Sequence, residues 1–375
     1  MAARVLILGG GIAGGAAALE LAGRGAAVTL VDRDQPGTGA TGASAGMLVP
    51  QYESGGPGPA FRFGLASKAL WPGFARRLEA LTQWPVGHRT DGMLVANRTP
   101  EEEEGARAAL AWQREAGLAG EVLTPAEARR IHPGVSPEVR SWIWLPAEAQ
   151  VDAQRLAVAL AAAVLGAGGT VLAGKAAVEI RAEGGRVTAA LLDDGTRVAA
   201  DAVVLAAGAW SPLVRGLPRA LPVRPVRGQI LRLLPDSPPP WPLLADHRGR
   251  YLVPRQNGTI LVGATVEDVG YDDGVTEAGR TILTEAALAL FPSLEHAKVV
   301  ERWAGLRPLS RDTLPVLGPE PALEGLFYAT GYGRNGILFA PLAARAMADL
   351  VLDGRTDVEW EPFAVKRFPD PVSDP

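Results

Sequence analysis

The first 32 residues carry the pattern that most restricts the fold: an apolar run, a glycine cluster, an alanine-rich stretch and a second apolar run. Residues 5–8 are wholly apolar, as expected of a parallel strand that is buried on both faces. Residues 12–23 lack proline and are rich in alanine and leucine, which favours a helix, and residues 28–31 supply a second strand. This order of strand, helix and strand predicts an α/β domain of the Rossmann type.

The turn between the first strand and the helix has the spacing G-x-G-x-x-G, made by Gly9, Gly11 and Gly14. The first glycine permits the tight turn, the second lets a pyrophosphate approach the backbone, and the third lets the helix pack close to the strand. The helix N-terminus would then face the phosphates. Asp32 ends the second strand, where its carboxylate can accept hydrogen bonds from ribose hydroxyls. The turn therefore predicts a dinucleotide site and leaves NAD and FAD equally possible.

Composition limits the class of protein. The 375 residues are too many for one ordinary core and predict two domains. A net charge of −4 provides no basic footprint for nucleic acid, and no apolar run reaches 18 residues, so we expect neither a nucleic-acid partner nor a membrane partner. A strand that begins near residue 5 leaves no room for a signal peptide, which predicts a cytoplasmic protein.

Two residue types restrict the chemistry further. The sequence has no cysteine, which excludes disulfides, thiolate ligands and a flavin tethered through cysteine sulfur. It has 4 histidines, and none are spaced i, i+4. We therefore expect no metal site.

Residues 175–208 break the tie between the two cofactors. Three strand-like runs are separated by E-G-G and D-D-G-T, both hairpin signals, and an apolar run follows. This predicts a three-stranded antiparallel meander that returns to a buried parallel strand. A plain NAD dehydrogenase has no need of this insertion, whereas flavoproteins of the glutathione-reductase-like type contain it, so the meander favours FAD.

The remaining segments predict two interleaved domains, α/β in the cofactor domain and α+β overall. Residues 216–300 hold several strand candidates, which suit an antiparallel sheet that carries the substrate. The end of the chain reads as a strand, a glycine-rich turn and an amphipathic helix, and belongs with the N-terminal part. The predicted boundaries are 1–84, 146–215 and 301–365 for the FAD-binding domain, 85–145 and 216–300 for the substrate domain, and 366–375 for a C-terminal tail.

Seven motifs, GGGIAGG, SAGML, VVLAAGAWS, YLVPR, TILVGAT, WAGLRP and GYGRNGILFAP, extend over nearly the whole chain. Together they resemble the D-amino acid oxidase/sarcosine oxidase family of FAD-dependent amine oxidoreductases, and within it the glycine oxidase group. The resemblance implies a glutathione-reductase-like FAD domain that binds FAD non-covalently. The implied cofactor residues are Gly9, Gly11, Ile12, Ala13, Gly14, Asp32, Arg33, Ala40, Thr41, Ala45, Gly46, Met47, Val178, Gly208, Tyr332, Gly333, Arg334, Asn335, Gly336, Ile337 and Leu338.

The same resemblance implies a substrate site. Arg307 of WAGLRP would hold the substrate carboxylate, because a guanidinium presents a planar bidentate fork and stays charged when buried. Tyr251 would donate its hydroxyl to the same carboxylate, Arg334 would lie near both flavin and substrate, and Met47 and Val266 would form the wall. Three alternatives stay open: Arg307 as half of a structural ion pair, Tyr251 as an ordinary strand aromatic, and Arg334 as a cofactor residue only.

The implied reaction is oxidative deamination. Hydride would pass from the α-carbon to flavin N5, dioxygen would reoxidise the flavin with release of hydrogen peroxide, and the imine would hydrolyse to a 2-oxo acid and ammonia. Glycine, sarcosine, D-alanine and D-proline are the implied substrates, with a further implied role in supplying thiazole synthesis for thiamine. Two positions depart from the group's pattern: Gly249 replaces a histidine and Val266 a methionine.

Other functions remain open on the sequence. A D-amino acid or sarcosine dehydrogenase would pass its electrons to a quinone or protein instead of oxygen. A flavin-binding subunit would have no turnover of its own, and an NAD-linked dehydrogenase is disfavoured by the meander. A homo-oligomer is expected on general grounds, although no interface is evident in the sequence.

Overall fold

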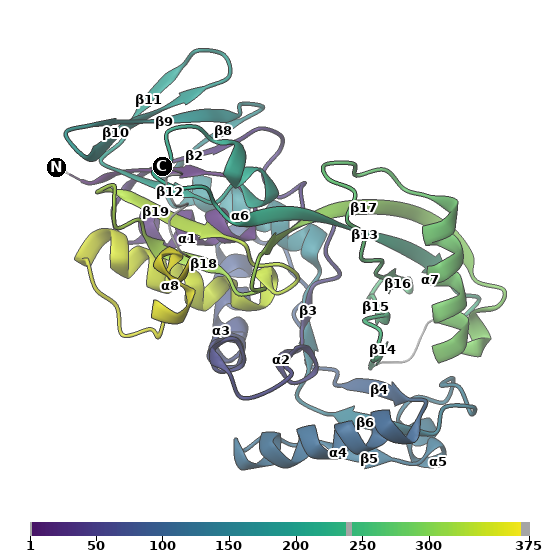
Figure 1. The fold of residues 1–375 in the computed structure, drawn as a ribbon. Helices are drawn as coiled ribbons and strands as arrows, with labels where there is room; N and C mark the ends of the chain where they lie inside the picture. Colours follow the sequence, from purple (N-terminus) through teal and green to yellow (C-terminus); the bar gives the residue numbers. More distant parts are fainter. Residues whose placement is uncertain (1, 238–241, 369–375) are drawn as a thin grey trace, which may run out of the picture.

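The chain is built around two large β-sheets (Figure 1). The computed structural model describes residues 2–237 and 242–368, so residues 369–375 of the expected C-terminal tail lie outside the described residues. Within the described part, none of the helices is long and apolar enough to cross a membrane.

The first sheet contains the predicted strand–helix–strand unit. Its six strands lie in the order β18 (Val316–Pro319), β19 (Leu326–Thr330), β12 (Ala202–Leu205), β1 (Arg4–Leu8), β2 (Ala27–Asp32) and β8 (Thr170–Ala173). All neighbours are parallel except β18 and β19, which form an antiparallel edge. Helix α1 (Ile12–Gly23) begins and ends at the predicted residues. The Rossmann-type prediction is therefore confirmed.

The two faces of this sheet have different covers, because side chains alternate along a strand. Val5 and Ile7 of β1 face a helical layer, whereas Leu6 and Leu8 face a small second sheet. The helical layer contains α1, α3 (Pro59–Thr82), α6 (Ala153–Gly166) and α8 (Gly336–Asp353). The small sheet is the predicted antiparallel meander of β9 (Ala177–Glu183), β10 (Arg186–Leu192) and β11 (Arg197–Ala199).

The second sheet has eight strands and is mostly antiparallel. Its order is β17 (Lys298–Ser310), β13 (Val223–Leu234), β16 (Ile260–Gly263), β15 (Tyr251–Pro254), β14 (Leu243–Asp246), β4 (Met93–Asn97), β6 (Ser141–Leu145) and β5 (Glu121–Leu123). Its strands come from the two segments assigned to the substrate domain, and β17 continues the sheet past the expected boundary at residue 300. One face packs on α5 (Pro125–Ile131) and α7 (Glu277–Leu290), and the other turns Tyr251 and Ile230 toward the first sheet.

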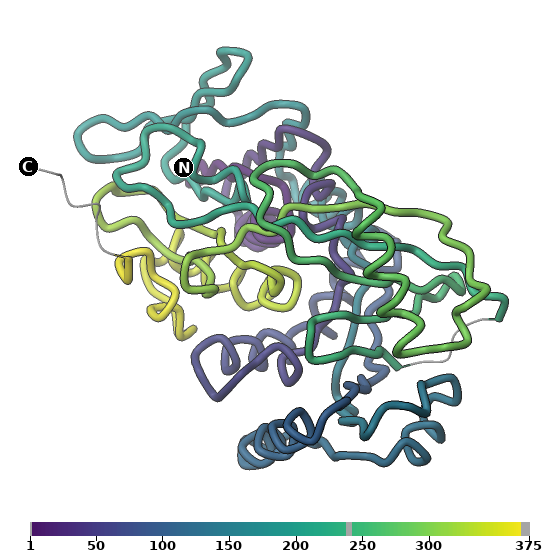
Figure 2. Tube along the Cα trace, turned by 45° about the vertical axis from the view of Figure 1, so that its right-hand side comes forward, coloured from purple at the N-terminus to yellow at the C-terminus, as the bar shows by residue number. Residues whose placement is uncertain are grey.

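Short elements complete the chain. They are the paired strands β3 (Met47–Leu48) and β7 (Ala149–Gln150), the helices α2 (Pro50–Glu53) and α4 (Pro100–Glu115), and the 3₁₀ helices η1 (Gly208–Leu213), η2 (Pro292–Leu294), η3 (Glu361–Phe363) and η4 (Val365–Arg367). The views in Figures 1 and 2 both place the yellow C-terminal helix α8 beside the purple N-terminal helix α1. The two ends of the chain therefore lie side by side around the first sheet, which also takes β8 and β12 from the middle of the chain.

His132 gives the second domain a predictable dependence on pH. Its side chain is buried against the ring of Phe291, and burial lowers the pKa of His132 from 6.5 to about 4. Between these pH values the unfolded chain binds a proton that the folded chain does not, so the free energy of unfolding should fall as the pH drops from about 6.5 to about 4. The loss should reach about 3 kcal/mol at most.

Urea unfolding at several pH values measures this effect. We expect His132→Leu to flatten the dependence in this range, whereas the same change at the exposed His296 should leave it as in the wild type. Equal slopes for the wild type and His132→Leu would contradict the assignment.

Candidate functional site

A continuous cavity of about 1350 Å³ lies between the two sheets. One end is formed by the turn after β1 and by the meander, and the other by Arg307 and Tyr251 of the eight-stranded sheet. Pockets for drug-sized ligands usually measure about 300–1,000 Å³. The cavity is therefore large enough for a dinucleotide together with a small second molecule.

The sequence-predicted site residues converge on this cavity. All of them except Gly14 line it: Gly9, Gly11, Ile12, Ala13, Asp32, Arg33, Ala40, Thr41, Ala45, Gly46, Met47, Val178, Gly208, Tyr251, Val266, Arg307, Tyr332, Gly333, Arg334, Asn335, Gly336, Ile337 and Leu338. Gly14 lies beneath the turn, where it contacts Gly9. Gly249, the position that departs from the group's pattern, also lines the cavity.

The glycines of the turn are needed because backbone approaches backbone there. Gly9 has a φ of +110°, and a Cβ atom on it would lie 2.3 Å from the carbonyl oxygen of Ala206. A Cβ atom on Gly14 would lie 1.9 Å from the carbonyl oxygen of Gly9. The N-terminus of α1 can reach the cavity floor only without these side-chain atoms.

Asp32 holds the turn itself. One carboxylate oxygen accepts a hydrogen bond from Gly10 N at 2.6 Å, and the other accepts one from Asp34 N at 2.9 Å. Burial raises the pKa of Asp32, and these two hydrogen bonds act in the opposite direction. Asp32 therefore supports the glycine turn directly. It also lines the cavity, and its contact with a ribose is still a prediction.

Arg33 and Trp210 close the same end of the cavity. The guanidinium carbon of Arg33 lies 3.4 Å from the centre of the Trp210 ring, a cation–π contact. Trp210 belongs to η1, directly after β12, and its ring also approaches Tyr271. The sequence analysis quoted Trp210 within GAWS but gave it no role.

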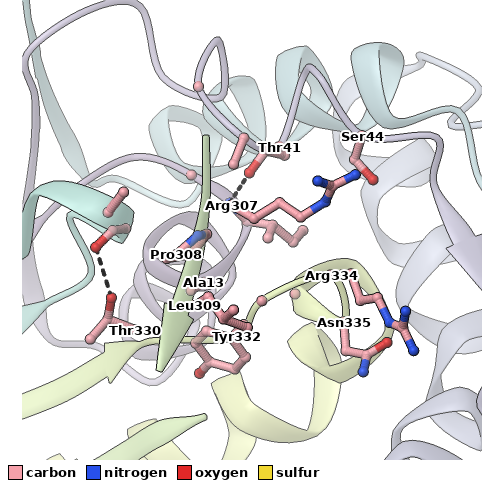
Figure 3. Close-up of a pocket in the computed structure, with 18 of the residues that line it drawn as sticks. Ala13, Thr41, Ser44, Arg307, Pro308, Leu309, Thr330, Tyr332, Arg334 and Asn335 are labelled. Atoms are coloured by element: carbon pink, nitrogen blue, oxygen red, sulfur yellow. Dashed lines mark hydrogen bonds between the residues drawn. The ribbon is translucent and has the colours of Figure 1, made fainter. Parts of the chain in front are cut away.

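Most of residues 40–47 line the cavity, and several long-range hydrogen bonds hold the segment in place. The hydroxyl of Thr41 accepts a hydrogen bond from Ile12 N at 2.8 Å (Figure 3). Arg255 of β15's YLVPR motif donates to the carbonyl oxygen of Ala45 at 2.7 Å and to Gln150 Oε1 at 2.8 Å. Burial lowers the pKa of Arg255 to about 10, so it stays charged near neutral pH. The sequence analysis gave Arg255 no role, although it supports the residues that line the cavity.

Arg307 and Tyr251 lie together at the other end of the cavity. Figure 3 shows Arg307 reaching from its strand toward Ser44. Its Nη1 atom donates to the carbonyl oxygens of Thr265 at 3.1 Å and Arg227 at 3.3 Å, and no acidic side chain among the described residues forms an ion pair with it. The alternative of a structural ion pair therefore has no support in the described part of the chain.

Two glycines make room for these side chains. A Cβ atom on Gly228 would lie 2.3 Å from the guanidinium nitrogens of Arg307, and one on Gly263 would lie 2.4 Å from the Tyr251 hydroxyl oxygen. Both belong to strands that read as ordinary sheet, so the sequence alone did not single them out. Burial raises the pKa of Tyr251, an effect that the charge of Arg307 partly offsets, so the phenol stays protonated.

Arg334 has an acidic partner. It forms an ion pair with Glu53, the last residue of α2, whose side chain is only 8% exposed. Burial raises the pKa of Glu53, and Arg334 opposes that effect. The pair neutralises Arg334, whereas Arg307 forms no ion pair with an acidic side chain among the described residues. Glu53 was not predicted from the sequence.

The residues present fit FAD. The glycines of the turn after β1 let a ligand come close to the backbone, and the N-terminus of α1 lies there as well. Both features suit a pyrophosphate. The Tyr332 hydroxyl is buried beside the cavity and has no hydrogen-bond partner among the described residues. Such a buried polar atom is costly unless a ligand or water satisfies it. The turn from Tyr332 to Gly336, which carries Arg334 and Asn335 in Figure 3, leads into α8.

Comparison with known proteins points to the same cofactor. A family model described as "DAO: FAD dependent oxidoreductase" matches residues 4–350. Glycine oxidase of Geobacillus kaustophilus is 34% identical over 97% of this chain and 96% of its own length. The crystal structure of glycine oxidase from the same organism matches with a TM-score of 0.94 at 33% identity, over 98% of this chain and 100% of that chain.

The chain is also similar to part of a longer protein. The bifunctional protein ThiO/ThiG of Nostoc sp. is 36% identical over 94% of this chain. The match covers 53% of that relative, so this chain spans about half its length.

Gly14 offers a test of the cavity floor. We expect Gly14→Ala to lower the free energy of unfolding by about 3 kcal/mol, because the new methyl group must displace the Gly9 carbonyl or the helix. The same displacement should reduce the dinucleotide content of the purified protein. Urea unfolding and absorbance spectra measure both quantities.

Gly105→Ala is the matched control. Gly105 lies inside α4, and a Cβ atom there would meet nothing within 4 Å. This change should stabilise the protein by about 0.5–1 kcal/mol and leave the dinucleotide content unchanged. If both variants behaved alike, the close approach at Gly14 would have no energetic significance.

Proposed function

The chain belongs to the FAD-dependent oxidoreductase family, and we propose that it oxidises glycine or another small amino acid with dioxygen as the electron acceptor. The candidate substrates are glycine, sarcosine, D-alanine and D-proline. One observation carries the proposal: an unpaired arginine and a protonated tyrosine share a cavity with the glycine turn. The name of the full-length relative supports the same class of substrate.

The cofactor would lie between the glycine turn and the residues after β19. Gly9, Gly11 and Ile12 would hold the pyrophosphate, Arg33 would lie at the ribose end, and residues 332–338 would hold the isoalloxazine edge. When bound, FAD supplies a two-electron oxidation of the amine carbon and returns the electrons to dioxygen, which leaves as hydrogen peroxide.

Arg307 would bind and orient the substrate carboxylate. Two backbone carbonyls hold its Nη1 atom, which fixes the plane of the guanidinium. A carboxylate in that plane gains charge-assisted hydrogen bonds, and no competing acid among the described residues has to be displaced. The Tyr251 hydroxyl stays protonated at neutral pH, so it can donate to the same carboxylate.

The wall of the cavity favours a small substrate. Met47, Tyr52 and Val266 line it, and the Tyr52 hydroxyl donates to the carbonyl oxygen of Asp246 at 2.7 Å, which fixes its ring. Gly249 also lines the cavity and contributes no side chain. This arrangement leaves space for a methyl group or a small ring on the amine or the α-carbon.

Three further features of the proposal come from the sequence and its relatives. We expect a cytoplasmic protein and a homo-oligomer. Because a similar region forms half of a protein named ThiO/ThiG, we also propose that the oxidation product feeds thiazole synthesis for thiamine.

Anaerobic titration of the purified protein with glycine, sarcosine, D-alanine and D-proline tests the function. Loss of flavin absorbance near ~450 nm, followed by recovery and peroxide formation in air, would support an oxidase and identify its substrate. Bleaching that air does not reverse would indicate a dehydrogenase. A yellow protein that none of the amino acids bleaches would favour a flavin-binding subunit and contradict the proposal.

Arg307→Ala tests the carboxylate contact. We expect it to retain FAD and to raise KM for the amino acid about 100-fold, because a charge-assisted contact of about 3 kcal/mol is lost. Steady-state kinetics with a peroxide assay measure this change. The control is Arg224→Ala on the neighbouring strand β13, where the side chain pairs with Asp268 at the surface. A wild-type KM in Arg307→Ala would remove Arg307 from the site.

A further inference from the structure

Backbone carbonyl oxygens hold the guanidinium of Arg307 in place. Its Nη1 atom is held by the carbonyl oxygens of Arg227 and Thr265, at 3.3 and 3.1 Å. Gly228 lies against the guanidinium and has no side chain to displace it. The direction in which Arg307 presents its remaining N–H groups therefore depends on where these two carbonyls lie.

The two carbonyls belong to neighbouring segments of chain that are connected by only a few hydrogen bonds. Arg227 and Glu267 form an isolated antiparallel bridge, with backbone hydrogen bonds of 2.9 and 3.0 Å. Gln229 N donates to the Thr265 hydroxyl at 2.9 Å. β16 ends at Gly263, so Thr265 lies outside a regular ladder, whereas Arg227 lies within β13 and pairs with Leu306 of β17. The position of the Thr265 carbonyl relative to β13 therefore depends on these few contacts.

The side chain of Glu267 connects both carbonyl-bearing residues. Its Oε2 atom accepts a hydrogen bond from Arg227 Nη2 at 2.7 Å. Its Oε1 atom accepts from the Thr265 hydroxyl at 2.5 Å and from Gln229 Nε2 at 2.8 Å. One carboxylate therefore receives three hydrogen bonds, two of them from the residues whose carbonyls hold Arg307.

This cluster is charged, and its arginine is buried while Glu267 is partly exposed. Arg227 is 4% exposed and also pairs with Asp272 at 2.6 Å, which ties down the far side of the same loop. Burial acts to raise the pKa of Glu267, but its hydrogen bonds with Arg227, Thr265 and Gln229 outweigh that effect and lower the pKa. Glu267 therefore stays ionised, and removal of its charge would leave Arg227 buried without its better-covered partner.

We propose that Glu267 is a positioning residue for Arg307: it holds the Thr265 segment against Arg227 of β13, so that the Thr265 carbonyl keeps the guanidinium facing the substrate carboxylate. The inference rests on the proposed function of Arg307. Glu267 itself does not line the cavity, whereas Val266, directly before it, does. The same cluster therefore also sets the place of one wall residue.

The test measures carboxylate binding separately from catalysis. Glycolate has a carboxylate but no amine, and its binding to the purified holoenzyme can be followed by the change in flavin absorbance. We expect Glu267→Gln to raise the dissociation constant of glycolate about 10-fold, since small errors in placement are costly. KM for glycine should rise by a larger factor than kcat falls, with FAD content and melting temperature as in the wild type.

Asp268→Asn is the matched control, because Asp268 is the next acid along the chain and pairs with Arg224 at the surface. It should bind glycolate like the wild type. Arg307→Ala distinguishes a failure of the positioning role of Glu267 from a failure of the proposed function. If Arg307→Ala loses glycolate binding but Glu267→Gln retains it, the positioning role is wrong and the proposed function stands. If Arg307→Ala binds glycolate like the wild type, both are wrong.

Thr265→Val decides the matter if Glu267→Gln fails to fold. This change removes the hydrogen bond from the Thr265 hydroxyl to Glu267 and the one that this hydroxyl accepts from Gln229 N, and it leaves every charge in place. We expect a rise of about 3-fold in the dissociation constant of glycolate, because the segment that carries the Thr265 carbonyl is then held less firmly. An unchanged constant would overturn the proposal.

Discussion

The site depends on close approach at positions that have no side chain. At the cofactor end, Gly9 and Gly14 let the helix, the strand and the neighbouring β12 end meet without a Cβ atom between them. At the substrate end, Gly228 and Gly263 do the same for the guanidinium of Arg307 and the ring of Tyr251. A methyl group at any of the four positions would have to move backbone or a functional group. The shape of the cavity therefore depends on glycine at these four positions as well as on the residues that line it.

Most of the arginines in and around the cavity that we have described have a specific partner. Arg334 is neutralised by Glu53, Arg255 is satisfied by carbonyl and amide oxygens, and Arg33 stacks on Trp210. Arg307 has two backbone carbonyls on one nitrogen, lies beside Tyr251, and forms no ion pair among the described residues. A half-buried guanidinium without a counter-charge favours an anionic ligand. This is why we propose Arg307 as the contact for a carboxylate.

The sequence predicted the local features well. The strand–helix–strand unit with α1 and the meander depend on signals within about 35 residues, namely apolar periodicity, hairpin turns and the glycine spacing. Glu53, Trp210 and Arg255 were missed because their roles arise only from tertiary contacts. Arg255 reaches Ala45 across 210 positions, and Glu53 meets Arg334 from the opposite end of the chain. Single-sequence patterns contain no information about such pairs, and the family resemblance covered only residues within its motifs.

One strand links the two ends of the site. β17 carries Arg307, and the next residue, Pro308, accepts a hydrogen bond from Gly333 N at 2.7 Å. Leu309 forms an isolated bridge with Tyr332. The arginine that we propose for the substrate carboxylate and the turn that we propose for the cofactor are therefore attached to consecutive residues of a single strand. A displacement of β17 would move both together, so the strand links the placement of Arg307 to that of the turn. A rotation of the Arg307 side chain would change their separation, and the proposed role of the Glu267 cluster is to resist such a rotation.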